Sequence, residues 1–150
     1  MDGLTTADGR RLAYRRAGSG PMLVCHPGGP GFSSLYLGKL SGLGEHLELV
    51  LIDPRGTGGS DPPYDRRAFA IDDYVSDLEE LRAHLGLERM LLFGHSHGGM
   101  VAMAYAARHP ERVERLILAS TTSSPAPPVL RSSRKGSRTQ RQWCCRESAT

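Results

Sequence analysis

One serine stands in a setting that could make it a nucleophile. The pentapeptide G-H-S-H-G runs from Gly94 to Gly98 and has Ser96 at its centre. It follows the apolar run Met90–Phe93, typical of a buried strand, and precedes Met100–Arg108, typical of a helix. On such a sharp strand-to-helix turn, side chains two positions either side of the serine would collide, so both positions favour glycine. Ser96 is therefore the predicted nucleophile, with Gly94 and Gly98 as the glycines of its elbow.

Acyl transfer also requires donors for the oxygen that becomes negatively charged. Two N–H groups usually supply this stabilisation. The N–H of His97 directly follows the nucleophile, at a predicted helix N-terminus that favours negative charge. A second loop, H-P-G-G-P-G over His26–Gly31, follows the apolar run Met22–Cys25, and its glycine backbone can approach a ligand closely. We predict an oxyanion hole made by His97 and by Gly28 or Gly29.

A third glycine-rich loop, D-P-R-G-T-G-G-S, covers Asp53–Ser60 and follows the apolar run Leu47–Ile52. We interpret it as scaffold, because loop glycines mostly serve backbone geometry. Asp53 and Arg55 are expected to pair and brace the turn. A phosphate-binding loop is not favoured, since the segment lacks the G-K-[ST] ending.

Strands and helices are predicted to alternate along residues 1–119. Further strands are expected at Arg11–Arg16 and Val113–Ala119, and a short helix broken by glycines at Leu35–Leu43. The clearest helix should begin with Asp72 or Asp73 as its N-cap and end at Gly86. Its apolar face comprises Val75, Leu78, Leu81 and Leu85.

This order predicts the α/β class, with a mostly parallel sheet that is flanked by helices and covered on both faces. All three glycine-rich loops follow strands, so they should open onto one rim, where ligands bind in such sheets. The sheet is expected to be truncated after about the sixth strand, which would leave Val113–Ala119 as an exposed edge.

Together the three loops resemble the α/β-hydrolase fold family. H-P-G-G-P-G and D-P-R-G-T-G-G-S are most similar to the proline iminopeptidase-like branch, whose usual loops are H-G-G-P-G and D-Q-R-G-x-G-x-S. Pro27 is an extra residue in this comparison, and Gly59 stands where the peptidases usually have arginine. The resemblance covers residues 3–119. It implies a serine hydrolase acting on an ester, amide or N-terminal peptide bond through an acyl-enzyme on Ser96.

The same resemblance implies a triad in the chain order serine, acid, histidine. After His109 the sequence has no histidine, and after Ser120 its only acid is Glu147. His95 and His97 should point away from the Ser96 hydroxyl, and their H-x-H spacing offers too few ligands for a metal.

The remaining histidines are not expected to replace the missing base. His26 should hold the glycine loop through hydrogen bonds, while His46, His84 and His109 look like surface or helix-end residues. Three interpretations stay open: an impaired serine hydrolase, a non-catalytic remnant or ligand-binding module, and a half-enzyme completed by a separate chain.

Composition divides the chain into two parts. Residues 1–120 are expected to be the N-terminal part of an α/β-hydrolase domain. Residues 121–150 are rich in Ser, Arg and Pro, carry six basic residues against Glu147, and are predicted to be disordered.

No run of 18 apolar residues and no secretory signal is seen, so a cytoplasmic location is expected. Cys25, Cys144 and Cys145 form neither a disulfide framework nor a zinc pattern. We expect no cofactor, no metal, no nucleic-acid or membrane partner, and a small molecule or short peptide as substrate. The sequence leaves the oligomeric state open.

Overall fold

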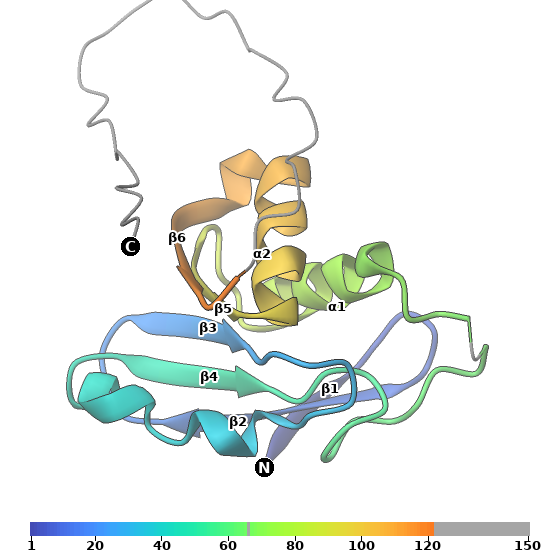
Figure 1. The fold of residues 1–150 in the computed structure, drawn as a ribbon, viewed down its shortest axis with the longest axis horizontal. Helices are drawn as coiled ribbons and strands as arrows, with labels where there is room; N and C mark the ends of the chain where they lie inside the picture. The colour runs from blue at the N-terminus through green and yellow to red at the C-terminus, as the bar shows by residue number, and fades with distance from the viewer. Residues whose placement is uncertain (66, 122–150) are drawn as a thin grey trace, which may run out of the picture.

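A computed structural model of the chain describes residues 1–65 and 67–121 (Figure 1). The tail predicted for residues 121–150 lies outside these ranges, apart from Thr121. Six strands form one sheet in the order β1-β2-β4-β3-β5-β6. Their bounds are β1 Asp2–Thr5, β2 Arg11–Ala17, β3 Met22–His26, β4 Glu48–Ile52, β5 Met90–His95 and β6 Val113–Ala119.

The sheet is mostly parallel, as predicted. Strands β4, β3, β5 and β6 run parallel to one another, whereas β1 and β2 join on one side as antiparallel strands. The strands expected from apolar runs are present within two residues of their predicted bounds. Strand β1 was not predicted, because its residues D-G-L-T contain one large apolar side chain, Leu4, and show no apolar run.

Helix α1 covers Ile71–His84, and its start differs from the prediction. The N-cap is Ala70, with extended backbone angles, rather than Asp72 or Asp73. Asp73 instead lies at the third helical position, where its carboxylate accepts a hydrogen bond from the Ala70 N–H at 2.9 Å. The end agrees with the prediction, because Gly86, the residue after the C-cap Leu85, adopts a φ of +68°.

Helix α2 covers His97–Arg108 and begins three residues before the predicted Met100. Gly98 and Gly99 have low helix propensity, which is why the sequence favoured a later start. The segment predicted as one short helix over Leu35–Leu43 is instead two 3₁₀ helices, Ser34–Leu37 and Leu40–Glu45. Leu40 and Ser41 have positive φ angles there, so a continuous α-helix is not formed.

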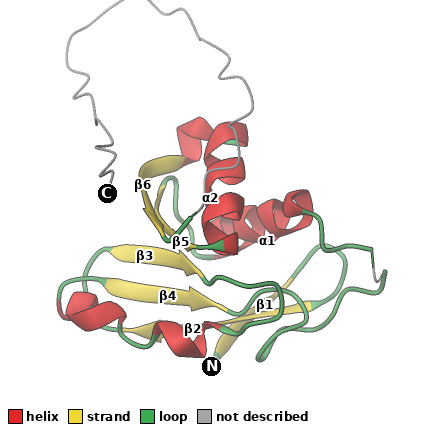
Figure 2. Cartoon of the chain, viewed as in Figure 1, coloured by secondary structure: helices red, strands yellow, loops and turns green. Residues whose placement is uncertain are grey.

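The parallel strands bury alternate side chains on two opposite faces. Val24 and Val50 lie in a cluster with residues of α1 and α2, and Figure 2 shows these two helices together on one side of the sheet. Leu23 and Leu49 belong to a second, smaller cluster that includes Leu37 of the first 3₁₀ helix. Each central strand is therefore packed on both faces.

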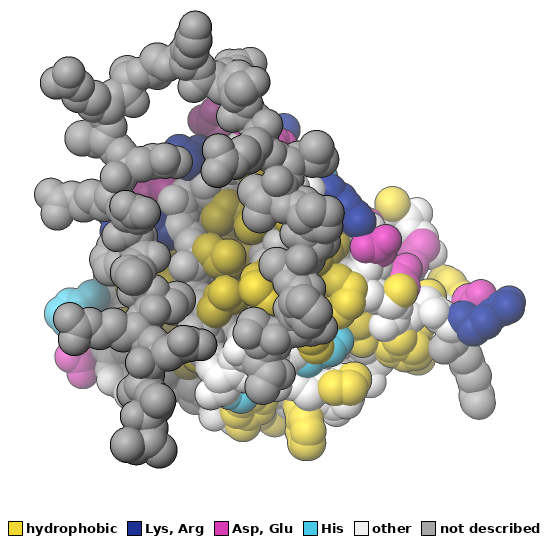
Figure 3. All heavy atoms as spheres, turned by 45° about the horizontal axis from the view of Figure 1, so that its top comes forward, with side chains coloured by type: hydrophobic (Ala, Val, Ile, Leu, Met, Phe, Trp, Pro, Cys, Tyr) yellow, Lys and Arg dark blue, Asp and Glu magenta, His cyan; other side chains and the backbone are white. Residues whose placement is uncertain are grey.

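Strand β6 differs from the inner strands in its exposure. It pairs with β5 and forms one edge of the described sheet, and Ile117 and Leu118 remain 44% and 41% exposed. Hydrophobic side chains gather on the face shown in Figure 3. Within residues 1–65 and 67–121, no helix has the length and apolar character needed to cross a bilayer.

Candidate active site

Ser96 lies between the last residue of β5 and the first residue of α2, on a sharp turn. Its backbone angles are φ 50° and ψ −115°, a region that L-residues rarely adopt. Backbone strain of this kind costs about 1–3 kcal/mol and occurs most often at functional sites. The Ser96 N–H donates to the Ala119 carbonyl oxygen at 2.9 Å, which ties the turn to the end of β6.

The two glycines of the pentapeptide are required by close backbone contacts. A Cβ on Gly94 would lie 2.4 Å from the Gly98 carbonyl oxygen. A Cβ on Gly98 would lie 2.3 Å from the Pro27 carbonyl oxygen and 2.4 Å from that of His26. Glycine at these positions therefore allows the turn to close and allows the loop His26–Gly31 to pack against the start of α2.

The loop His26–Gly31 follows β3 and lies beside the serine. A Cβ on Gly28 would lie 2.9 Å from the Cβ of Ser96, so these two residues are in direct contact. Gly29 has a φ of +70° and packs against the ring of Phe32. Among the described residues, the N–H groups of Gly29 and His97 have no hydrogen-bond partner, whereas the Gly28 N–H donates to the Tyr36 hydroxyl at 2.5 Å. Of the three predicted donors, Gly28 contacts Ser96 and His97 directly follows it, whereas Gly29 is the next residue along the loop.

His26 is buried and serves the loop rather than the serine. Its Nδ1 lies 2.9 Å from the Pro27 carbonyl oxygen, and its ring packs edge-on against Tyr74. Burial lowers the pKa of His26 to about 4, so the ring is neutral at pH 7. Burial also lowers the pKa of His97, whose ring packs against the same Tyr74.

Within the described part of the chain, no histidine hydrogen-bonds to the Ser96 side chain. His95 contacts the Tyr36 hydroxyl through Nδ1 at 2.8 Å. His84 lies 3.2 Å from the Tyr14 hydroxyl, and the ring of His109 packs against Tyr105. None of these rings is held against the nucleophile as a base would be.

The loop Asp53–Ser60 is bonded differently from the prediction. Asp53 accepts hydrogen bonds from the Ser34 N–H at 2.8 Å, the Ser34 hydroxyl at 2.7 Å and the Gly59 N–H at 3.0 Å. The predicted pair between Asp53 and Arg55 is wrong, because these donors already occupy the carboxylate. Arg55 instead forms two hydrogen bonds of 2.8 Å with Asp77 of α1.

The sequence did not predict two residues that bond to the glycine-rich loops, Asp77 and Tyr36. Asp77 is buried and also receives Arg10, at 3.1 Å. Its signal was an acid on the apolar face of α1, where a buried charge requires a partner. Tyr36 is part of no recognisable motif, and only the fold brings its hydroxyl group to the N–H of Gly28.

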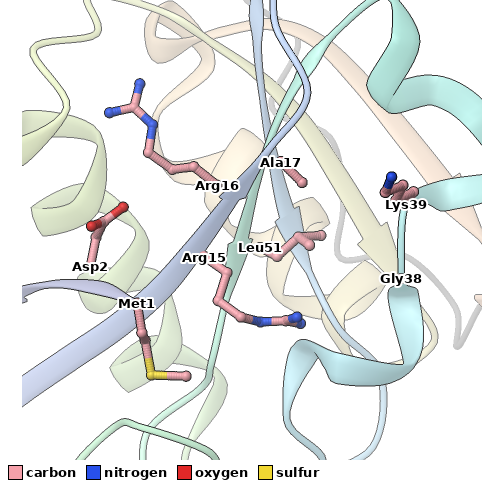
Figure 4. Close-up of a pocket in the computed structure, with 8 residues that line it drawn as sticks. All are labelled: Met1, Asp2, Arg15, Arg16, Ala17, Gly38, Lys39 and Leu51. Atoms are coloured by element: carbon pink, nitrogen blue, oxygen red, sulfur yellow. The ribbon is translucent and has the colours of Figure 1, made fainter.

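A cavity of about 480 Å³ lies elsewhere in the molecule. It is lined by Met1, by residues of β1, β2 and β4, and by the link between the two 3₁₀ helices (Figure 4): Met1, Asp2, Arg15, Arg16, Ala17, Gly38, Lys39 and Leu51. None of them belongs to the serine turn or to the loop His26–Gly31. The candidate active site is therefore defined by the turn and the loop.

Comparison with known proteins agrees with this geometry. The profile of the alpha/beta hydrolase fold family matches residues 21–143. A proline iminopeptidase of Saccharolobus solfataricus is 40% identical over 113 residues, which are 74% of this chain and 36% of that protein. A proline iminopeptidase of Lactobacillus helveticus is 38% identical over 118 residues, or 76% of this chain and 40% of that protein. The chain thus spans well under half the length of these relatives.

Solved structures show the same likeness. A hydrolase from Pseudomonas aeruginosa superposes with a TM-score of 0.73 and 31% identity, covering 84% of this chain and 48% of that one. An esterase from Exiguobacterium antarcticum gives 0.69 and 30%, covering 78% and 44%. By its sequence and its fold, this chain belongs to the α/β-hydrolase family and is similar to the proline iminopeptidases over its N-terminal part.

Proposed function

We propose that the chain carries the nucleophile half of a serine hydrolase that acts on an ester, amide or N-terminal peptide bond. The observation that carries this proposal is the strained backbone of Ser96, in contact with Gly28 of the loop His26–Gly31. The N–H groups of Gly29 in this loop and of His97 have no partner among the described residues. Iminopeptidases and an esterase among the similar proteins support the substrate class. The substrate would be a small molecule or a short peptide. The cytoplasmic location expected from the sequence stays part of this proposal.

In the proposed reaction the Ser96 Oγ attacks the carbonyl carbon of the substrate and loses its proton. The carbonyl oxygen becomes an oxyanion that accepts hydrogen bonds from the N–H of His97 and from the N–H of one loop glycine. The tetrahedral intermediate then collapses to an acyl-enzyme, and the leaving group departs with a proton. Water attacks the acyl carbon, releases the acid and restores the serine hydroxyl.

Among residues 1–65 and 67–121, no side chain is hydrogen-bonded to the Ser96 hydroxyl as a proton acceptor. A serine without a base is a weak nucleophile, and loss of triad members typically lowers the rate by about 10⁴–10⁶-fold. We therefore propose that the chain by itself is impaired and reacts with activated electrophiles rather than with unactivated amides.

A fluorophosphonate probe tests the proposal. Intact-protein mass spectrometry would compare wild type with Ser96→Ala and with Ser19→Ala, a matched variant at an exposed serine. We expect one added phosphonyl group on wild type and on Ser19→Ala, and none on Ser96→Ala. Equal labelling of wild type and Ser96→Ala would refute a reactive Ser96.

A second candidate is a non-catalytic ligand-binding module, favoured by the absence of a histidine bonded to Ser96 among the described residues. Turnover of p-nitrophenyl esters separates the two functions. A rate above that of Ser96→Ala supports the hydrolase, and no difference between the two proteins favours the binding module.

A further inference from the structure

Tyr36 lies on a short 3₁₀ helix that is anchored by its neighbours. Ser34 and Leu37 are buried, and Ser34 is bonded to Asp53, whereas the Tyr36 side chain is 50% exposed. Burial of the ring therefore does not explain its orientation. The polar contacts of its hydroxyl group do.

The Tyr36 hydroxyl forms two hydrogen bonds with segments that are distant in sequence. It accepts from the Gly28 N–H at 2.5 Å, and it lies 2.8 Å from Nδ1 of His95. Because Gly28 donates to the oxygen, the single hydroxyl hydrogen is free to donate to His95. The two rings also pack edge-on, with their centroids 5.7 Å apart.

These bonds join the two parts of the candidate active site. Gly28 belongs to the loop that contacts the Cβ of Ser96, and His95 directly precedes that serine. One hydroxyl group thus connects the loop to the end of β5. It also occupies the N–H of Gly28, whereas the N–H groups of Gly29 and His97 have no partner within the described residues.

We propose that Tyr36 is a positioning residue that holds the loop His26–Gly31 beside the nucleophile. By occupying the Gly28 N–H, it assigns the oxyanion to the N–H groups of Gly29 and His97. This inference rests on the proposed function, since an oxyanion forms there only if Ser96 reacts.

Tyr36→Phe removes the hydroxyl and keeps the ring, and Tyr64→Phe is the matched control at a tyrosine that is 83% exposed. In amide-resolved NMR of the full chain, we expect the Gly28 proton of Tyr36→Phe to move upfield. Its hydrogen exchange should become about tenfold faster, the effect of losing one hydrogen bond. The His95 Nδ1 resonance should shift as well. Tyr64→Phe should match wild type in the Gly28 proton shift, the Gly28 exchange rate and the His95 Nδ1 shift.

Kinetics of fluorophosphonate labelling give the functional readout. We expect the maximal labelling rate of Tyr36→Phe to fall about tenfold, with the half-saturating probe concentration unchanged, because the oxyanion donors are misplaced while probe binding persists. A general loss of folding would instead change both parameters and the circular dichroism spectrum.

The outcomes separate the two proposals. An unchanged Gly28 amide in Tyr36→Phe overturns the role of Tyr36, whether or not Ser96 reacts. A shifted amide with an unchanged labelling rate also overturns it. If wild type is labelled no more than Ser96→Ala, the proposed function fails, and the Gly28 exchange rate alone decides whether Tyr36 holds the loop.

Discussion

The loops His26–Gly31 and Asp53–Ser60 follow neighbouring parallel strands, β3 and β4, and both are rich in glycine. Their hydrogen bonding differs. In Asp53–Ser60 the Thr57 N–H donates to the Pro54 carbonyl oxygen at 3.0 Å, and the Ser60 N–H donates to that of Thr57 at 2.9 Å. The Asp53 carboxylate takes three further donors.

The loop His26–Gly31 satisfies fewer of its own polar groups. The Gly28 N–H is met by a side chain from outside the loop, and the Gly29 N–H has no partner among the described residues. Gly29 is half-buried and Pro30 and Gly31 are exposed, so this N–H is within reach of solvent or of a substrate oxygen. The comparison teaches that glycine content alone does not separate scaffold from site, whereas the hydrogen-bond partners do.

Substitutions that disrupt the contacts of the loop Asp53–Ser60 should lower the free energy of unfolding more than those at the loop His26–Gly31. Asp77→Asn would remove the charge that receives Arg55 and Arg10, both of them nearly fully buried. Breaking a buried ion pair costs about 3–5 kcal/mol, so we expect the free energy of unfolding in urea to fall by that amount. Asp65→Asn, at an exposed carboxylate, should change it by less than about 0.5 kcal/mol. Equal effects of the two substitutions would show that the Arg55 contacts do not brace the loop.

Because His26 begins the loop His26–Gly31, the free energy of unfolding should depend on pH through this loop. His26 has a pKa lowered by burial to about 4, so the unfolded chain binds more protons than the folded one between about pH 6.5 and 4. As the pH falls through this window, the free energy of unfolding should decrease by about 3 kcal/mol, and His97 adds a change of the same sign.

Urea titrations at pH 7 and pH 4.5 measure this difference, with His26→Asn as the comparison. The variant should lose most of the slope. A wild-type stability that is flat over the window would mean that His26 is hydrated or charged in the folded chain.

The loop His26–Gly31 packs so closely against the start of α2 that an added methyl group should disrupt the contact. Gly98→Ala places a Cβ against the carbonyl oxygens of Pro27 and His26, and we expect a loss of about 1–3 kcal/mol of stability. Labelling of Ser96 should also decrease, because the loop must move away. Gly44→Ala is the control, since its Cβ would make an ordinary contact at 3.7 Å with Leu49. Unimpaired labelling of Gly98→Ala would break the link between the loop and the serine.

The smallest effect is expected at the serine itself, and it has the opposite sign. Ser96→Gly should raise the free energy of unfolding by about 1 kcal/mol, because glycine adopts a positive φ without strain. Ser76→Gly, inside α1, should lower it by about 0.5–1 kcal/mol. Thermal melts of both variants test this. A destabilised Ser96→Gly protein would argue that the turn stores no strain.

Local patterns predicted the elements well, and long-range contacts account for the rest. The apolar runs located β3, β4, β5 and β6, and Gly86 marked the end of α1. The glycine spacing around Ser96 predicted a sharp turn, and Ser96 has the positive φ of such a turn. By contrast, the ion pair of Arg10 with Asp77 joins residues 67 positions apart, and no periodicity encodes it.

The same limit applies inside the site. Gly28 and Gly29 were equivalent candidates in the sequence, and only the position of Tyr36 distinguishes their N–H groups. The predicted pair of Asp53 with Arg55 is wrong because residues close in sequence need not have side chains that are close in the fold. In the fold, Asp53 bonds to Ser34 whereas Arg55 bonds to Asp77.

The hydrogen bond from the Ser96 N–H to Ala119 has a mechanical consequence. The nucleophile is tied to the end of β6, and the adjoining Thr121 side chain packs against Gly99 of α2. A load applied to the chain after residue 121 would therefore reach the serine before it reached the central strands. The strained residue Ser96 is thus bonded to a strand that has one neighbour in the described sheet.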